Sequence, residues 1–315
     1  MDNDPLPDLS PIRLEDRRTF DQFFIACRSR LSDYTFANAF IWRDQDRRWW
    51  KIIHDCLCVF ANGDKSLTML YPPLGNGDFV AALRESMEIC QAYNHTQDTR
   101  IEYISEETIG KFPSDFTRAP MSGDYIYETA RMIDLAGGGL ASKRQSRNRF
   151  LREHQARTED FQLRHIPACI ALLSAWEDAK TPSPEESAKR DKEIVAAVEA
   201  MRHAPAIGLK GMVLFADDQL AGFTLGEYLS PDTCSILIEK TDRNFAGSAQ
   251  YIFSEFCRQY WADTQWCNVG DDWEIPTLAW TKQSYRPAFR LLKWRAALCT
   301  FIAAHRRMLL NLNTS

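Results

Sequence analysis

A short apolar run in the second half of the chain ends in a dense group of ionisable side chains. Residues 234–238 are apolar and follow the turn signal SPDT, so we expect a buried strand there. Glu239, Lys240, Asp242 and Arg243 come directly after it. A partly desolvated carboxylate can take a proton from an attacking amine or hydroxyl. We therefore predict that Glu239 is the general base, and that Asp242 and Arg243 bind substrate.

Gly247 begins the next expected element, a helix. Apolar side chains follow at helical spacing, in the order Ala249, Ile252, Phe253, Phe256, Cys257 and Tyr260. Ser248 is placed to cap this helix. The first N–H groups of a helix and the positive end of its dipole face the preceding loop, so a phosphate or carboxylate can bind there. Gly247 is thus a candidate substrate-binding residue, and backbone donors near it are candidates for stabilising an oxyanion.

Glu227 is a second candidate carboxylate for binding substrate. It lies in an expected strand that alternates apolar with small or polar residues over 223–226. We expect Glu227 to project with the polar set, at a strand end adjacent to Glu239. Together the two carboxylates would hold an amine substrate. The structural alternative is a pair of rim carboxylates matched by Lys240 and Arg243.

A third group of candidates follows the short strand expected at 265–269. Asn268, Asp271 and Asp272 lie where this strand meets a loop, and we predict that they bind substrate. Loop carboxylates more often form turns, which is the structural alternative. Tyr285, in the segment KQSYRP, is the candidate general acid for the leaving group, with a role in packing as its alternative.

The segment 142–157 is strongly basic. It predicts a helix that places Arg144, Arg147 and Lys143 on one side, with Phe150 and Leu151 turned inward. These three cations are candidates for contact with phosphates, in tRNA or in another polyanion. A solvated linker helix is the alternative interpretation.

The elements that must position these side chains recur in the same order in two halves of the chain. In the first half we expect strands at 49–53, 57–61 and 67–71, a glycine loop and a helix at 79–93. In the second half we expect strands at 211–216, 221–229 and 234–238, a loop and the helix after Gly247. We therefore predict an N-terminal domain over 1–136 and a C-terminal domain over 137–315 that carries the active site.

Composition limits the class of protein. A chain of 315 residues that is 45% hydrophobic has room for two packed cores. Its net charge of −5 argues against a protein that coats nucleic acid. Neither a signal peptide nor a membrane helix is expected, because the start is acidic and the apolar stretch 296–304 is short.

Cysteine usage points to a reducing compartment. The nine cysteines are scattered, mostly in apolar contexts, as expected of free core thiols in the cytoplasm. His54, Cys56 and Cys58 alternate along an expected strand without a second pair of ligands, so no metal site is expected.

Six segments together resemble a known family. They are LSDYTFANAFIWR (31–43), SKRQSRNRF (142–150), FTLGE (223–227), IEKTD (238–242), NVGDDWEI (268–275) and KQSYRP (282–287). Their co-occurrence resembles the C-terminal domain family of phosphatidylglycerol lysyltransferases in a soluble, stand-alone form. That resemblance implies an α+β fold of two tandem acyl-CoA N-acyltransferase (GNAT)-like domains, each a mixed, mainly antiparallel sheet flanked by helices, as in the Fem-type aminoacyl transferases.

The resemblance also implies a function. Family enzymes move an aminoacyl group from tRNA to a lipid head group, so we expect an aminoacyl or acyl transferase with no tightly bound cofactor. Aminoacyl-tRNA or acyl-CoA is the expected donor, and a small molecule or a lipid head group the expected acceptor. Two arginines common in the family are replaced here by Val269 and Ala279, which weakens the grip on phosphate or carboxylate. An acyl-CoA-dependent N-acyltransferase and a non-catalytic binding protein are the alternatives.

Overall fold

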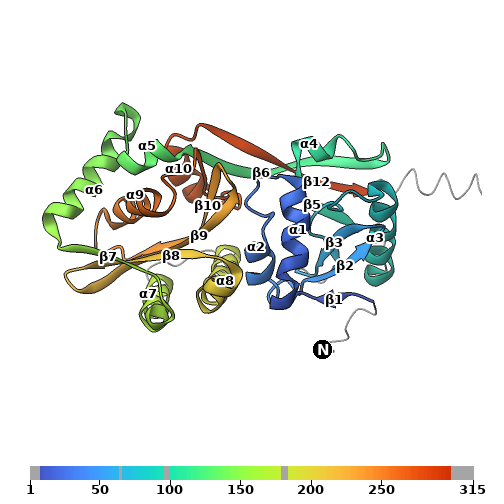
Figure 1. Ribbon diagram of the computed structural model, residues 1–315, viewed down its shortest axis with the longest axis horizontal. Helices are drawn as coiled ribbons and strands as arrows, with labels where there is room; N and C mark the ends of the chain where they lie inside the picture. The colour runs from blue at the N-terminus through green and yellow to red at the C-terminus, as the bar shows by residue number, and fades with distance from the viewer. Residues whose placement is uncertain (1–7, 64–65, 96–98, 179–183, 299–315) are drawn as a thin grey trace, which may run out of the picture. The chain divides into compact units, whose positions relative to one another are not determined.

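The computed structural model describes residues 8–63, 66–95, 99–178 and 184–298 (Figure 1). These residues form two compact units. Unit 1 draws on 8–28, 43–122 and 292–298, and unit 2 on 29–42 and 123–291. The sequence analysis predicts one domain boundary near residue 136, based on the repeated pattern of elements. The two units, in contrast, each draw on several separate segments of the chain. That boundary stays a prediction.

Unit 1 is a mainly antiparallel sheet with helices. Its strands are β1 (Ser10–Pro11), β2 (Trp49–Ile53), β3 (Cys56–Ala61), β4 (Thr68–Met69), β5 (Arg100–Ser105), the first part of β6 (Phe116–Glu128) and most of β12 (Phe289–Leu298), and its helices are α1 (Arg17–Cys27), α3 (Phe79–Asn94) and α4 (Glu106–Ile109). The strand order is β1-β2-β3-β4-β5-β12-β6. From β1 to β12 in this order, the β4–β5 pair is the parallel one among the described residues, and the other pairs are antiparallel.

Unit 2 contains every candidate site residue. Its strands are the end of β6 (Phe116–Glu128), β7 (Ala156–Asp160), β8 (Lys210–Ala216), β9 (Gln219–Ser230), β10 (Thr233–Thr241) and β11 (Trp266–Asn268). Its helices are α2 (Phe36–Ile41), α5 (Thr129–Asp134), α6 (Ala141–Glu153), α7 (Ile166–Asp178), α8 (Pro184–Ile207), α9 (Ser248–Tyr260) and α10 (Pro276–Ser284). The strand order is β6-β11-β10-β9-β8-β7, and among these described strands only the β10–β11 pair is parallel.

The two units repeat one succession of elements, as the sequence pattern predicts. In unit 1, strands β2, β3 and β4 form an antiparallel meander, helix α3 follows, and β5 pairs parallel to β4. In unit 2, β8, β9 and β10 form the meander, α9 follows, and β11 pairs parallel to β10. A helix between two parallel strands is the connection that such a pair requires. The predicted mixed, mainly antiparallel architecture is therefore confirmed.

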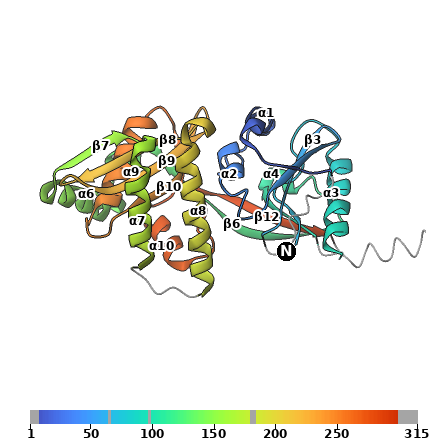
Figure 2. The ribbon, with the colours of Figure 1, turned by 90° about the horizontal axis from the view of Figure 1, so that it is seen from below.

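Helices cover both faces of the unit 2 sheet. Helices α6 and α9 lie on one face, and α7 and α8 lie side by side on the other (Figures 1 and 2). Helix α9 turns its apolar residues toward the sheet, where Ile252 and Phe256 are fully buried beside Cys234 and Cys267. This packing fixes α9 against β10 and β11, the strands that carry the candidate site.

The cysteines are free within the described residues. All eight there lack disulfide bonds, and all but Cys27 are buried. This agrees with the expectation of core thiols for those eight, while Cys299 lies outside the described residues.

Candidate functional site

Strands β10 and β11 separate within unit 2 and open an edge of the sheet. They run parallel and pair over three residues, the last pair being Ser235 with Asn268. Strand β11 ends at Asn268, whereas β10 continues to Thr241. A register shift against β9 marks a bulge at Leu237. The last part of β10 therefore has no β11 partner on this edge, an arrangement that parallel strands use to admit ligands beyond their carboxyl ends.

Glu239 lies on this separated part of β10. The residue is partly exposed, but its Oε2 atom is enclosed and has no hydrogen-bond partner. Burial raises the pKa of Glu239 from 4.5 to about 8, against the opposing effect of the neighbouring Lys240 charge. The carboxyl group thus holds a proton at neutral pH and can release it just above. That behaviour suits a group which exchanges a proton with substrate.

Tyr285 lies within electrostatic reach of Glu239. Its phenol is buried, and Gln250 Nε2 donates a hydrogen bond of 3.3 Å to its oxygen. Burial, and then the charge of Glu239, raise the pKa of Tyr285. The same two causes contribute to the raised pKa of Tyr127, whose hydroxyl donates to the Lys282 carbonyl at 2.7 Å. The structure thus brings the two predicted catalytic residues together, and their catalytic roles stay predictions.

The free energy of unfolding should depend on pH through Glu239. A carboxyl whose pKa is raised on folding stabilises the folded state fully below 4.5, and that contribution is lost as pH rises through about 8. Burial raises the pKa values of Tyr127 and Tyr285, so both phenols stay protonated over this range. We expect Glu239→Gln to gain stability over wild type between about pH 5 and about pH 9. Urea unfolding of both proteins at both pH values checks this. An equal difference in free energy of unfolding at the two pH values would contradict the enclosure of the Glu239 carboxyl group.

The three predicted phosphate contacts on α6 have different surroundings. Arg144 Nη1 donates to the carbonyl oxygens of Leu135 at 2.6 Å and Gly137 at 3.3 Å. Arg147 Nη1 donates to Ile133 O at 3.2 Å and to a serine hydroxyl on α9 at 3.0 Å. Both arginines thus satisfy carbonyl groups at the C-terminal end of α5, where cations are favoured. Their geometry supports a structural role.

Replacing Arg147 by alanine should therefore cost stability. The change leaves the Ile133 carbonyl with fewer donors and removes the hydrogen bond from α6 to Ser254 on α9. We expect a loss of about 1–2 kcal/mol in the free energy of unfolding, measured with urea. Arg152→Ala is the matched control, because Arg152 is exposed and makes no hydrogen bond or ion pair within the described residues. A loss of equal size in both variants would contradict the structural role.

Lys143 differs from these two arginines. Its Nζ lies 4.6 Å from the ring centroid of Tyr285 and 5.9 Å from that of Trp280. No carboxylate is paired with it in the part of the chain that the structure describes. Desolvation lowers the pKa of Lys143, since the rings shield the ammonium from water. Lys143 thus places a cation beside the candidate catalytic tyrosine.

Glu227 does not share a surface with Glu239. It pairs with Ser235 across the β9–β10 ladder, whereas Glu239 pairs with Thr224. Because side chains alternate along β9, Glu227 projects from the opposite face of the sheet to Thr224 and Glu239. There Glu227 Oε1 accepts a hydrogen bond of 2.7 Å from Thr35, the N-cap residue of α2. The prediction that the two carboxylates project from the same face is therefore wrong. Alternation along β9 places Glu227 on the face of the apolar residues Phe223 and Leu225.

Asn268 is held inside the protein. Its Nδ2 donates at 2.8 Å both to the Arg30 carbonyl and to Asp124 Oδ2, and its Oδ1 accepts from the Gly270 amide at 2.7 Å. The residue is fully buried. This network ties β11 to β6 and to the segment before α2, so the geometry of Asn268 supports a structural role rather than direct contact with substrate.

Asp271 and Asp272 both accept hydrogen bonds within their own turn, and Asp272 also holds a distant tyrosine. Asp271 Oδ1 accepts from the Trp273 amide, and Asp272 Oδ1 from the Glu274 amide, each at 3.0 Å. Asp272 Oδ2 accepts a hydrogen bond of 2.6 Å from Tyr125. These contacts match the turn-forming alternative that the sequence left open.

The start of α9 is closely covered by α6. Gly247 has φ +96°, and a Cβ atom there would lie 2.2 Å from the Ser146 carbonyl oxygen. That oxygen carries partial negative charge, so it disfavours an anion at this point. Ser248 does not cap the helix as expected, because its hydroxyl donates instead to the Asp242 carbonyl at 3.4 Å.

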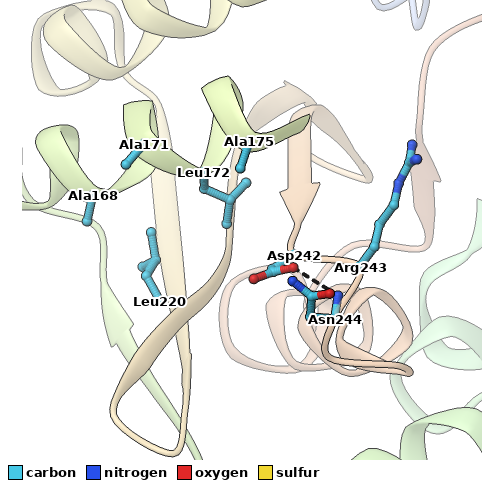
Figure 3. Close-up of a pocket in the computed structure, with 8 residues that line it drawn as sticks. All are labelled: Ala168, Ala171, Leu172, Ala175, Leu220, Asp242, Arg243 and Asn244. Atoms are coloured by element: carbon cyan, nitrogen blue, oxygen red, sulfur yellow. Dashed lines mark hydrogen bonds between the residues drawn. The ribbon is translucent and has the colours of Figure 1, made fainter. Parts of the chain in front are cut away.

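Asp242 and Arg243 border a pocket on the α7 side of the sheet (Figure 3). The pocket has a volume of about 420 Å³. It is lined by Ala168, Ala171, Leu172, Ala175, Leu220, Asp242, Arg243 and Asn244. Asp242 Oδ1 accepts from the Asn244 amide at 2.9 Å, so this carboxylate also stabilises its own turn. Glu239 faces α9 instead, so these residues and the predicted base belong to different faces.

Three residues that contact or pair with the candidate site residues were missed by the sequence interpretation. Thr224 pairs with Glu239, Gln250 contacts Tyr285, and Trp280 borders Lys143. Trp280 carries a usable signal, since a tryptophan on a short polar helix is a candidate surface contact. Thr224 and Gln250 carry no such signal, because only strand register and helix packing bring them to the site.

The fold and site define a class of protein. A meander of three antiparallel strands, a helix and a fourth strand parallel to the third, used twice, is the architecture of tandem GNAT-like proteins. The profile of the family described as phosphatidylglycerol lysyltransferase, C-terminal, matches residues 26–297. The chain belongs to that family.

Solved structures with the same fold have low sequence identity. A conserved protein of unknown function from Bacteroides thetaiotaomicron is 24% identical, with a TM-score of 0.83 over 92% of this chain and 99% of that one. L-PGS from Bacillus licheniformis is 14% identical, with a TM-score of 0.67 over 92% and 93%. FemX and a tandem GNAT protein from the clavulanic acid biosynthesis pathway have TM-scores of 0.55 and 0.53 at 9% identity. These likenesses show the fold.

A curated relative matches part of the chain. An uncharacterized protein of Mycoplasmoides gallisepticum is 26% identical over 177 residues. The match spans 55% of each protein, so the chain covers about half the length of this relative. Among the residues that the structure describes, no helix has the length and apolar character to cross a membrane.

Proposed function

We propose that this protein transfers an aminoacyl or acyl group from an activated ester or thioester to an amine or hydroxyl acceptor. The observation that carries this proposal is the enclosed carboxyl of Glu239, without a hydrogen-bond partner at Oε2 and within electrostatic reach of Tyr285, where β10 and β11 separate. A buried acid and a buried phenol at one opening provide a base for the nucleophile and an acid for the leaving group.

The proposed step moves two protons. Glu239, in its carboxylate form, takes a proton from the acceptor while the nucleophilic atom bonds to the donor carbonyl carbon. The bond from that carbon to the leaving oxygen or sulfur breaks, and Tyr285 gives its proton to the leaving atom. Glu239 then returns its proton to the tyrosinate. The charge of Glu239 raises the pKa of Tyr285. Protonation of Glu239 removes that charge, so Tyr285 becomes a stronger acid when the leaving group departs.

An aminoacyl donor is supported by the family and by the neighbours named L-PGS and FemX. We propose charged tRNA as the donor's carrier, and a small molecule or lipid head group as the acceptor. Lys143 is the α6 cation best placed to contact an anionic group of a substrate, since Arg144 and Arg147 bind backbone carbonyls. The Ser146 oxygen beside Gly247 disfavours the alternative donor, acyl-CoA, at the start of α9.

Incubation with a mixture of aminoacyl-tRNAs, and separately with acetyl-CoA, tests the proposal. Each donor is supplied with a pool of amine and hydroxyl acceptors, and the loss of ester or thioester is followed against time. We expect loss of the aminoacyl ester that depends on acceptor. Loss of thioester alone would assign an acyl-CoA N-acyltransferase, and loss of neither would support a non-catalytic binding protein.

Tyr285→Phe should test the general-acid role of Tyr285 independently of the general-base role of Glu239. The change removes one hydroxyl, whose contact within the described residues is the 3.3 Å hydrogen bond from Gln250. We expect transfer to fall by about 10-fold to 10²-fold with an ordinary donor. A donor with a good leaving group, such as an aryl ester, needs no acid and should lose little. An equal loss with both donors would contradict the role of Tyr285 as general acid.

A further inference from the structure

Two buried polar groups without partners face the same surface of the sheet. Thr224 is fully buried, and its Oγ1 has no hydrogen-bond partner. It pairs with Glu239 across the antiparallel β9–β10 ladder, and Glu239 Oε2 also lacks a partner. Side chains at such paired positions lie about 5 Å apart at Cβ. Leaving both groups unpaired costs free energy that a bound polar group would offset.

The chemistry of these groups favours an amine over an alcohol. A neutral primary amine has two N–H donors, one for each oxygen, and keeps its lone pair free for attack. An alcohol has a single donor, so it would have to accept from Thr224, which withdraws density from the attacking oxygen. When the amine is protonated, its charge also suits the carboxylate of Glu239. The adjacent Lys240 forms an ion pair with Glu193 at 2.8 Å, so the charge of Lys240 is matched elsewhere.

The outer part of the same site is cationic. Lys143 lies against the ring of Tyr285, the residue that the charge of Glu239 also reaches. Trp280 borders Lys143 and is 72% exposed. A ligand anchored at Glu239 can therefore place an anionic group at Lys143, with Trp280 screening the contact from water.

We propose that the acceptor is a primary amine that also carries a phosphate or carboxylate group, with its amine at Glu239 and Thr224 and its anion at Lys143. This inference rests on the proposed transferase function and narrows its acceptor. Glu239 and Thr224 hold the nitrogen, and Lys143 sets how far the anion lies from it. The product is then an amide, because the acceptor nitrogen replaces the leaving oxygen or sulfur.

Binding of four small probes tests the acceptor class without a donor. The probes are 2-aminoethyl phosphate, β-alanine, ethanolamine and glycerol 1-phosphate, each followed by thermal shift and by calorimetry. We expect whichever aminoalkyl anion matches the site to bind at least about 10-fold more tightly than ethanolamine or glycerol 1-phosphate, because each of these lacks one charged contact. The first two probes distinguish phosphate from carboxylate.

Variants assign the contacts. Lys143→Met keeps the chain over the rings and should lower affinity for the best aminoalkyl anion by about 10-fold while leaving ethanolamine binding unchanged. Thr224→Val should weaken every amine probe, and Thr224→Ser, which keeps the hydroxyl, should restore binding. Melting temperatures without probe verify that each variant is folded. If Thr224→Val does not fold, Thr224→Ser and Lys143→Met still decide the matter.

The outcomes separate this inference from the proposed function. Glycerol 1-phosphate binding as tightly as the aminoalkyl anions, or Lys143→Met binding them as wild type does, overturns the inference. Transfer that proceeds to hydroxyl acceptors and not to amines overturns the inference and leaves the function standing. Tight binding of an aminoalkyl anion with no transfer from either donor supports a binding site for that ligand, but it rejects the transferase function and with it the role of the ligand as acceptor.

Discussion

Glu239→Gln is expected to cut the rate of transfer by about 10²-fold or more. Glutamine keeps the shape of the side chain but cannot accept the proton that the nucleophile loses. The enclosed Oε2 and the raised pKa of about 8 place this group in the range where a general base works near neutral pH. The wild-type rate should therefore rise with pH toward a plateau above that value. The variant should lose this dependence.

Initial rates of wild type and Glu239→Gln, measured from about pH 6 to about pH 9.5, check the prediction around the pKa of Glu239. Glu153→Gln is the chemical control, since Glu153 is exposed on α6 and pairs with Arg149 at 2.8 Å. Because glutamine needs no proton to be buried, the melting temperature of Glu239→Gln should stay level or rise. Full activity in the variant, or a lower melting temperature, would make Glu239 a structural residue.

Gly247→Ala is expected to lower the free energy of unfolding by about 3 kcal/mol or more. Two effects add at this position. A backbone φ of +96° strains any residue with a Cβ atom, and that atom would lie 2.2 Å from Ser146 O and 3.0 Å from Phe150 Cβ. Either α6 moves away from the start of α9 or the helix start is rebuilt. Both changes remove close packing.

Urea unfolding of Gly247→Ala beside Gly138→Ala measures this effect. A Cβ atom on Gly138 meets nothing within 4 Å, so its substitution should leave stability within about 0.5 kcal/mol of wild type. Gly247→Ala with wild-type stability would mean that α6 does not pack on α9 as the structure has it. In that case the start of α9 would be open to an anion.

Local sequence determined much of the secondary structure. The strand expected at 49–53 has those bounds, and the helix expected at 79–93 ends one residue later, at Asn94. Both depend on side-chain periodicity within one segment, which short-range sterics and burial impose. Strand β6 was not predicted, because Pro120 and Gly123 inside it are turn signals. Its pairing with β11 covers only its last three residues, Ile126–Glu128, and depends on a segment distant in sequence.

The candidate site divides in the same way. The types of Glu239 and Tyr285 were enough to propose a base and an acid, because few side chains can exchange protons in this way. Their proximity, the enclosure of Glu239 Oε2 and the facing hydroxyl of Thr224 depend on register and packing between segments distant in sequence. Glu227 shows why local sequence does not predict such contacts, since it accepts a hydrogen bond from Thr35, which lies 192 residues away in the chain. The sequence determined which side chains could do chemistry, and tertiary structure decided which of them share a face, because strand register and helix packing join segments that local sequence cannot relate.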